Sequence, residues 1–341
     1  MKVAVYYNNK DVRIEERPIP EINDDELLVK VMASGICGTD VMEWYRIKKA
    51  PLVLGHEISG VIEKIGKNIK NFEIGDRVFV SHHVPCMKCC YCLNSYHTAC
   101  ETLHKTNFFP GGFSEYIRVP RINVELGTFV LPDSVSFDEG TFVEPLGTAV
   151  RAQRLANLKE NQTLLIIGSG ISGLIHLKLA KSKKIKKIIA VDINEYRLNA
   201  AKKFGADFIF DANNNLASEI KKINENRLAD LVIVCTGALP AAKLALECVD
   251  KGATILFFAV PKPDEKFEIP INNFWRNEIK VMASYGAAPV DLKESLELIK
   301  GKKINFEDMI THRLKFDEIQ KGFDLVAEAN ESLKVIVEMD K

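Results

Sequence analysis

The chain has 341 residues, 47% of them hydrophobic, enough for one large domain or two ordinary ones with sizeable cores. Its 46 basic side chains balance 46 acidic ones, so no overall charge favours nucleic acid or an anionic membrane as a partner. The apolar runs are far shorter than a membrane span, and the N-terminal MKVAVYYNNKDVRIEE lacks the apolar core of a signal peptide. We therefore expect a cytoplasmic protein that binds neither nucleic acid nor membranes.

The first 150 residues contain short β-like runs separated by Gly, Pro and Asn: KVAVYY, ELLVKVMAS, ISGVIEKIG, DRVFV and SEYIRVP. This pattern predicts a compact β-rich domain over 1–150.

Residues that can bind a metal are scattered through this part of the chain. Cys37 lies in GICGTD, His56 and Glu57 in LGHEISG, and Glu144 in VEPLGTAV. A mixed set of this kind is typical of catalytic zinc, which has three protein ligands and one open position. Each residue alone has an ordinary alternative, because a lone His beside a Glu is usually a surface or core pair and a lone Cys a small buried hydrophobe.

Five of the eight cysteines lie in VPCMKCCYCLNSYHTAC, residues 84–100. Cys86, Cys89, Cys92 and Cys100 have the spacing C-x2-C-x2-C-x7-C, which suits four tetrahedral thiolate ligands of zinc. Four protein ligands leave no position for a substrate, so we predict a structural zinc in this lobe. Cys90 falls outside the spacing. Free or redox-active cysteines are the alternative, although clustered cysteines in the cytosol favour a metal.

The segment TLLIIGSGISGLIHLKLAK predicts a strand, a glycine turn and a helix. Gly168, Gly170 and Gly173 form G-x-G-x-x-G, in which the glycines permit a tight turn, close approach to a pyrophosphate and helix–strand packing. Ile171 and Ser172 open the helix, whose N-terminal N–H groups can bind the phosphates. A coincidental turn is the alternative.

Asp192 ends the next apolar strand, nineteen residues after Gly173, near the spacing expected for a carboxylate that binds the adenosine ribose. Its charge would repel a 2′-phosphate, so NAD is favoured over NADP. Arg197 would weaken this preference, and we include it among the cofactor-binding candidates.

Strand and helix patterns continue to alternate as far as residue 286. NEYRLNAAKKFG predicts a helix with Asn194 as its cap and Gly205 as its stop. Repeated β-α units predict a doubly wound parallel sheet, here a dinucleotide-binding domain over 151–286. The helical FDEIQKGFDLVAEAN and the strand-like SLKVIVEM are expected to return to the first domain, so that 287–341 complete it.

Taken in order, GICGTD, GHE, the four cysteines, EP and GSGISG resemble the zinc-dependent medium-chain dehydrogenases over nearly the full chain, and most closely their polyol (sorbitol-type) and threonine dehydrogenase branches. The resemblance implies a GroES-like catalytic domain and a Rossmann domain with the active site between them. It implies that Cys37, His56 and Glu57 bind a catalytic zinc, and that Glu144 binds it directly or through water. A homotetramer is common in this branch, and dimers are known.

The chain departs from the family pattern at several positions. Met42 stands where many relatives have a proton-relay histidine, and Glu43 where sorbitol-type enzymes have a tyrosine. ASYG offers Ser284 and Tyr285 in place of an Arg-Tyr pair, and only eighteen residues separate Cys37 from His56. The substrate is therefore not identified by the resemblance.

We expect an NAD- and zinc-dependent enzyme that oxidises the secondary alcohol of a polyol, cyclitol or sugar. Thr39 would take the alcohol's proton, while Glu57 and Glu144 would temper the metal's charge and open its coordination. An L-threonine-type dehydrogenase and a non-catalytic NAD-binding protein are the alternatives. Further relay or ligand candidates are His82, His83, His97 and His104, whose default role is lobe surface or core packing. Candidate pocket residues are Trp44, Phe109, Phe113, Trp275 and Tyr285, with ordinary core packing as the alternative for each.

Overall fold

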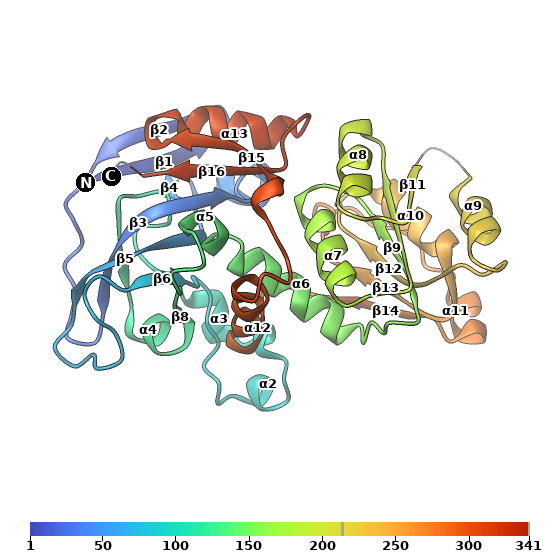
Figure 1. Ribbon diagram of the computed structural model, residues 1–341, viewed down its shortest axis with the longest axis horizontal. Coiled ribbons are helices and arrows are strands. Elements are labelled where there is room, and N and C mark those ends of the chain that lie inside the picture. Colours follow the sequence, from blue (N-terminus) through green and yellow to red (C-terminus); the bar gives the residue numbers. More distant parts are fainter. Residues whose placement is uncertain (213–214, 340–341) are drawn as a thin grey trace. The chain divides into compact units, whose positions relative to one another are not determined.

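The computed structural model describes residues 1–212 and 215–339, so the last two residues of the range 287–341 lie outside it. The chain forms two compact units, one made of Met1–Gly147 with Gly286–Lys341 and the other of Thr148–Tyr285 (Figure 1). Helix α6 (Val143–Leu155) contains the point at which the chain passes from the first unit to the second. None of the helices within 1–212 and 215–339 is long and apolar enough to cross a membrane.

The first unit is built on two β-sheets. The smaller has the order β2-β1-β4, with β1 (Lys2–Asn8), β2 (Asp11–Glu16) and β4 (Leu52–Val53). The larger has the order β15-β16-β3-β5-β6-β8, and β7 also pairs with β3. Its strands are β3 (Leu27–Ile36), β5 (Glu57–Ile65), β6 (Arg77–Val80), β7 (Tyr116–Val119), β8 (Thr128–Val130), β15 (Ile310–Lys315) and β16 (Lys334–Glu338). Only β15 and β16 run parallel to each other.

Short helices connect these strands. They are α1 (Glu43–Arg46), α2 (Cys90–Leu93), α3 (Glu101–Lys105), α4 (Arg121–Gly127), α5 (Phe137–Gly140), α12 (Pro289–Lys300) and α13 (Ile319–Glu328), with 3-10 turns at Ile47–Lys49, His97–Ala99, Glu307–Met309 and Phe316–Glu318. The C-terminal helix expected from FDEIQKGFDLVAEAN thus begins as a 3-10 turn and continues as α13. Phe323 of α13 packs against Tyr6 and edge-on against Phe113, with ring centroids 5.8 and 5.7 Å away. Of the two roles considered for Phe113, pocket lining and core packing, the structure shows the second, because this fully buried side chain fills the core.

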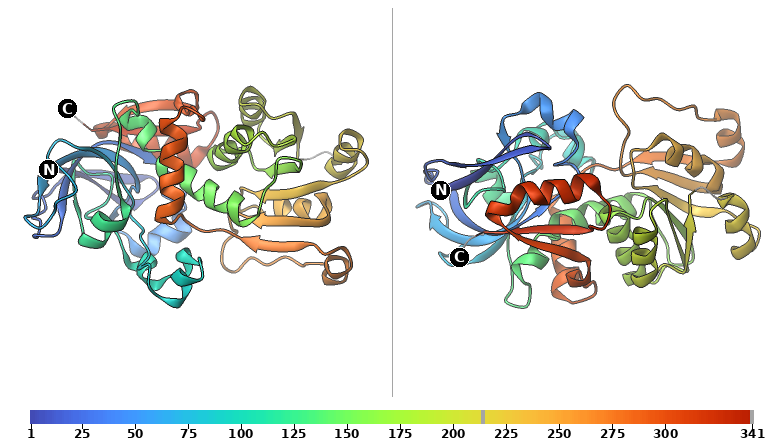
Figure 2. Two further views of the ribbon diagram at one scale, coloured as in Figure 1. Left: turned by 60° about the horizontal axis from the view of Figure 1, so that its bottom comes forward. Right: turned by 90° about the horizontal axis from the view of Figure 1, so that it is seen from above.

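The second unit has the predicted parallel sheet, in the order β11-β10-β9-β12-β13-β14. The strands are β9 (Thr163–Ile167), β10 (Lys187–Asp192), β11 (Phe208–Asp211), β12 (Ala229–Val234), β13 (Val249–Phe257) and β14 (Lys280–Ala283). The helices are α7 (Ile171–Ser182), α8 (Glu195–Lys203), α9 (Leu216–Ile223), α10 (Leu239–Cys248) and α11 (Ile271–Asn277). Helices α7 and α8 cover one face, and α9 and α10 the other (Figures 1 and 2).

Two local predictions for α8 are confirmed. The side chain of Asn194 caps the helix by accepting a hydrogen bond of 3.2 Å from the Arg197 N–H. Gly205 follows the end of the helix with a φ of +103°, a conformation that favours glycine.

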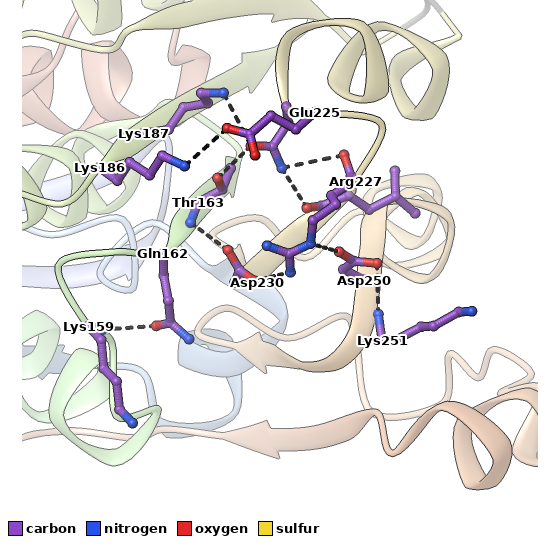
Figure 3. Close-up of polar contacts among 12 residues, drawn as sticks. Lys159, Gln162, Thr163, Lys186, Lys187, Glu225, Arg227, Asp230, Asp250 and Lys251 are labelled. Atoms are coloured by element: carbon purple, nitrogen blue, oxygen red, sulfur yellow. Dashed lines mark hydrogen bonds and ion pairs between the residues drawn. The ribbon is translucent and has the colours of Figure 1, made fainter.

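Polar side chains tie together the amino ends of the parallel strands (Figure 3). Asp230 accepts hydrogen bonds from the backbone N–H of Thr163 at 2.7 Å and from Arg227 at 2.6 Å. Arg227 also lies 2.9 Å from Asp250, and Lys187 donates to the side chain of Asn224. Because these contacts occupy the amino edge, the carboxyl edge remains the place for a ligand. There the connection from β9 leads to β10 and the connection from its neighbour β12 leads the opposite way, to β13, and such a point is where these sheets bind dinucleotides.

Candidate active site

Antiparallel pairing brings the first three candidate ligands together. Cys37 follows the end of β3, and His56 directly precedes β5, which begins at Glu57. Gly35 of β3 faces Glu57 in this pairing. The possible ligand atoms of Cys37, His56 and Glu57 consequently all lie within 4.8 Å of one another.

Asp40 supports this group from behind. Its side chain is fully buried, and Oδ2 accepts a hydrogen bond of 3.0 Å from the Cys37 N–H. Its Oδ1 lies 3.4 Å from His56 Nδ1, a contact that orients the imidazole so that Nε2 would be the nitrogen available to a metal. Burial works against the charge on Asp40, yet His56, Arg46 and the Cys37 N–H together lower the pKa of this carboxyl.

Glu144 and Lys334 complete the charged surroundings. Among the described residues, the set of possible ligand atoms that lie within 4.8 Å of one another contains Cys37, His56 and Glu57. Glu144, at the start of α6, is not part of this set. Burial, together with the negative charges of Glu57 and Asp40, raises the pKa of Glu144 to about 7 against the opposing effect of His56 and Lys334. Lys334 of β16 donates a hydrogen bond to Glu57 Oε2, and both side chains are buried.

The charges of this site suit a divalent cation. The carboxylates of Asp40 and Glu57, with Glu144 partly ionised near pH 7, face the positive charges of Lys334 and Arg46, and Cys37 would add a further negative charge when it binds a metal as thiolate. Burial lowers the pKa of His56, but Asp40 and Cys37 outweigh it and raise that pKa well above its usual value. A cluster that draws a proton onto His56 has an excess of negative charge, and its sulfur, nitrogen and oxygen donors are those that zinc accepts.

Thr39 lies beside the candidate ligands, where its hydroxyl is 3.3 Å from Cys37 Sγ. Arg46 binds this residue twice, donating from Nε to the Thr39 carbonyl at 2.9 Å and from Nη2 to the hydroxyl at 3.3 Å. Sequence reasoning did not identify Arg46, because nothing in WYRIKK indicates that its side chain turns back to Thr39. Met42 is the residue that precedes α1.

Two of the four additional histidines lie next to the site. The His82 ring is 4.9 Å from the His56 ring and 3.9 Å from the His83 ring, measured between centroids. Burial and neighbouring positive charges lower the pKa of His82 well below its usual value and that of His83 to about 4. Both are therefore neutral hydrogen-bonding groups near pH 7. His97 and His104 belong to the cysteine lobe, in a 3-10 turn and in α3.

The four spaced cysteines converge as predicted from their spacing. The sulfur atoms of Cys86, Cys89, Cys92 and Cys100 all lie within 4.8 Å of one another, and all eight cysteines of the chain are free of disulfides. Burial raises the pKa of the Cys100 thiol, but backbone N–H groups, including that of Cys86 at 3.4 Å, lower it to about 6. Cys90 is exposed and stands outside the group. These four thiols fit a tetrahedral metal.

The glycine turn between β9 and α7 has the geometry of a phosphate-binding loop. Gly168 has a φ of +94°, and a Cβ on Gly173 would lie 2.0 Å from the Gly168 carbonyl oxygen, so both positions require glycine. A Cβ on Gly170 would meet no atom within 4 Å, which leaves room for a ligand. Ile171 and Ser172 form the first turn of α7.

Asp192 is held beside this turn at the carboxyl end of β10. Its Oδ2 accepts a hydrogen bond of 2.7 Å from the Ser169 N–H, and its Oδ1 accepts one of 2.9 Å from the Asn194 N–H. Arg197 Nη1 lies 3.8 Å from Asp192 Oδ2. The predicted cofactor-binding residues thus occupy one edge of one sheet.

The remaining candidate pocket residues belong to both units, Trp44 and Phe109 to the first and Trp275 and Tyr285 to the second. Trp44 packs against Tyr45 with ring centroids 5.9 Å apart, and Phe109 lies under the Arg118 guanidinium. Trp275 of α11 and Tyr285 are exposed, whereas Ser284 is buried.

Comparison with known proteins agrees with this geometry. Residues 23–127 match the family model of the alcohol dehydrogenase GroES-like domain, and residues 172–301 match that of the zinc-binding dehydrogenases. Sorbitol dehydrogenase of Bacillus subtilis is 32% identical over 99% of this chain and 97% of its own, and D-xylulose reductase A of Aspergillus niger is 32% identical over 96% and 93%. The structure of galactitol-1-phosphate dehydrogenase from Escherichia coli superposes with a TM-score of 0.88 at 29% identity, covering 99% of this chain and 100% of the other. The predicted family and fold class are confirmed: the chain belongs to the zinc-binding dehydrogenases of the alcohol dehydrogenase type.

Proposed function

We propose that this enzyme transfers a hydride between NAD and the secondary alcohol of a polyol, cyclitol or sugar. Cys37, His56 and Glu57 would hold the catalytic zinc, and Glu144 would bind it directly or through water. The observation that carries the proposal is the convergence of these three donors in front of a buried carboxylate, Asp40, that orients the histidine.

Zinc would supply Lewis acidity, since it lowers the pKa of a bound water from about 15.7 to about 7 and acts on a bound alcohol in the same sense. The protein's part is to receive the proton and hold the reactants. As the Thr39 hydroxyl receives the alcohol's proton it passes its own proton onward, and Arg46 fixes its position through the contacts to its hydroxyl and carbonyl oxygens. Met42 has no group that can continue such a relay, so the proton leaves by the cofactor ribose or by water.

A hydroxyl-rich substrate is supported by the relatives and by the polar groups near the donors. The enzymes that this chain resembles over nearly its full length take their names from sorbitol, D-xylulose and galactitol 1-phosphate. His82 and His83 add neutral donors and acceptors beside His56. An L-threonine-type dehydrogenase would share the zinc donors, and the test below includes its substrate.

We propose that the cofactor is NAD rather than NADP, because the carboxylate of Asp192 would repel a 2′-phosphate. We also propose a second, structural zinc at Cys86, Cys89, Cys92 and Cys100.

We further propose that the protein is a homo-oligomer, a dimer or tetramer. The edge strand β14 exposes 41% of Val281, and the neighbouring α11 exposes 76% of Trp275. An unpaired edge flanked by exposed apolar side chains is suited to pairing with a second copy. Light scattering of the purified protein measures this directly.

The test of the function is NADH formation by zinc-loaded protein, read at 340 nm. The panel contains polyols, inositols, sugars, galactitol 1-phosphate, threonine and simple secondary alcohols, each with NAD and with NADP. We expect activity on a polyol or sugar with NAD and two zinc ions per chain. Activity on threonine alone would select the amino-alcohol reaction. Silence across the panel with both zinc ions bound would contradict the proposal.

A further inference from the structure

Lys334 forms a buried ion pair with one of the candidate zinc ligands. The side chains of Lys334 and Glu57 are 1% and 2% exposed, although the two residues lie 277 positions apart in the sequence. Strands β16 and β5 lie on either side of β3, where Val335 faces Ile36 and Glu57 faces Gly35. The pair therefore bridges two strands across the end of a third.

The surroundings of the pair hold it together. A Cβ on Gly35 would lie 2.5 Å from Glu57 Oε2 and 2.6 Å from Lys334 Nζ, so the absence of a side chain at this position makes room for the contact. The Lys334 ammonium also lies over the Phe142 ring, with Nζ 5.3 Å from the ring centroid. Because separating two buried charges is costly, Glu57 Oε2 stays engaged by Lys334.

An engaged carboxylate is a weaker metal ligand. A metal beside Cys37 and His56 must share Glu57 with an ammonium that withdraws its negative charge and restrains one of its two oxygens. We propose that Lys334 is a positioning residue that weakens Glu57 as a zinc ligand, so that a zinc ion bound beside Cys37 and His56 would be held less tightly through Glu57. This inference rests on the proposed catalytic zinc.

The test measures how fast zinc leaves the protein when a chromogenic chelator is added in excess. In Lys334→Met the freed carboxylate binds zinc more strongly, and the catalytic zinc should leave roughly 10- to 100-fold more slowly, the range typical of changes in groups behind metal ligands. Zinc bound by the four cysteines should leave in a separate kinetic phase, and the rate of that phase should be the same in Lys334→Met as in wild type. In a Glu57→Gln background Lys334→Met should have no effect, because the ligand on which it acts has lost its charge.

Gly35→Ala provides a second route if Lys334→Met folds poorly, since its methyl group forces the two charges apart without removing either. It should also slow zinc release. The matched control is Lys302→Met, which removes a pair of 2.9 Å between an exposed lysine and the buried Glu139 in the same unit and should leave both phases unchanged. Unchanged or faster release in Lys334→Met and Gly35→Ala would overturn the role of Lys334 while leaving the proposed function intact. Absence of zinc from the wild-type site would overturn both.

Discussion

Replacing Asp192 by serine tests the cofactor assignment. In the structure this carboxylate stands at the carboxyl end of β10, beside the glycine turn and 3.8 Å from Arg197. A hydrogen bond to a charged group contributes about 1.5–3 kcal/mol, and about 1.4 kcal/mol corresponds to a factor of ten. Losing one such bond to the adenosine ribose should weaken NAD binding roughly 10- to 150-fold.

NADP should respond in the opposite sense. Asp192→Ser removes the charge that repels a 2′-phosphate and leaves the positive charge of Arg197 near that phosphate's place. Calorimetric titration of each cofactor into wild type and variant measures the two affinities without a known substrate. The control is Asp207→Asn, which removes charge near the amino edge of the same sheet, where Asp207 accepts a bond of 2.7 Å from the Ile188 N–H. An unchanged ratio of NAD to NADP affinity in Asp192→Ser would refute the reasoning.

Three further substitutions test other parts of the structure. Thr39→Val should lower kcat by about 100-fold or more, the lower end of the range for loss of proton transfer, and should leave NAD affinity unchanged. Thr39→Ser, which keeps the hydroxyl, should remain largely active. Stopped-flow measurement of hydride transfer compares the variants with wild type, and equal rates in Thr39→Val and wild type would exclude Thr39 as the relay. Cys92→Ser should release one zinc and lower the Tm, because three thiolates bind the ion less tightly; elemental analysis that still finds two zinc ions per chain would contradict the assignment. Gly173→Ala should abolish NAD binding, since its methyl group would collide with the Gly168 carbonyl oxygen; normal titration curves would show that the turn relaxes at little cost.

Features set by neighbouring residues could be predicted from the sequence. The four cysteines lie within fifteen residues, so a short loop can bring their sulfur atoms together whatever the rest of the chain does. The glycine turn, the Asn194 cap and the alternation of strands and helices likewise depend on backbone conformation and local hydrogen bonds.

Features set by pairing between distant segments could not be predicted in this way. Motif resemblance nominated Cys37, His56 and Glu57, but their approach depends on the register of β3 with β5. The roles of Asp40 and Arg46 depend on side chains that fold back onto the same loop. Phe113, suggested as a pocket residue, lies in the core because α13 returns from the far end of the chain to cover it.

Lys334 shows this limit most clearly. Within SLKVIVEM, Lys334 cannot be told from an ordinary strand residue, and the local pattern predicts only that this segment forms a strand. The order of strands in the larger sheet places its ammonium against Glu57, in a space that the missing side chain of Gly35 leaves open. Motifs record which chemical groups are present and how closely they follow one another. The tertiary structure decides which charges are buried together, because burial and ion pairing depend on how the strands of the sheet are ordered and paired.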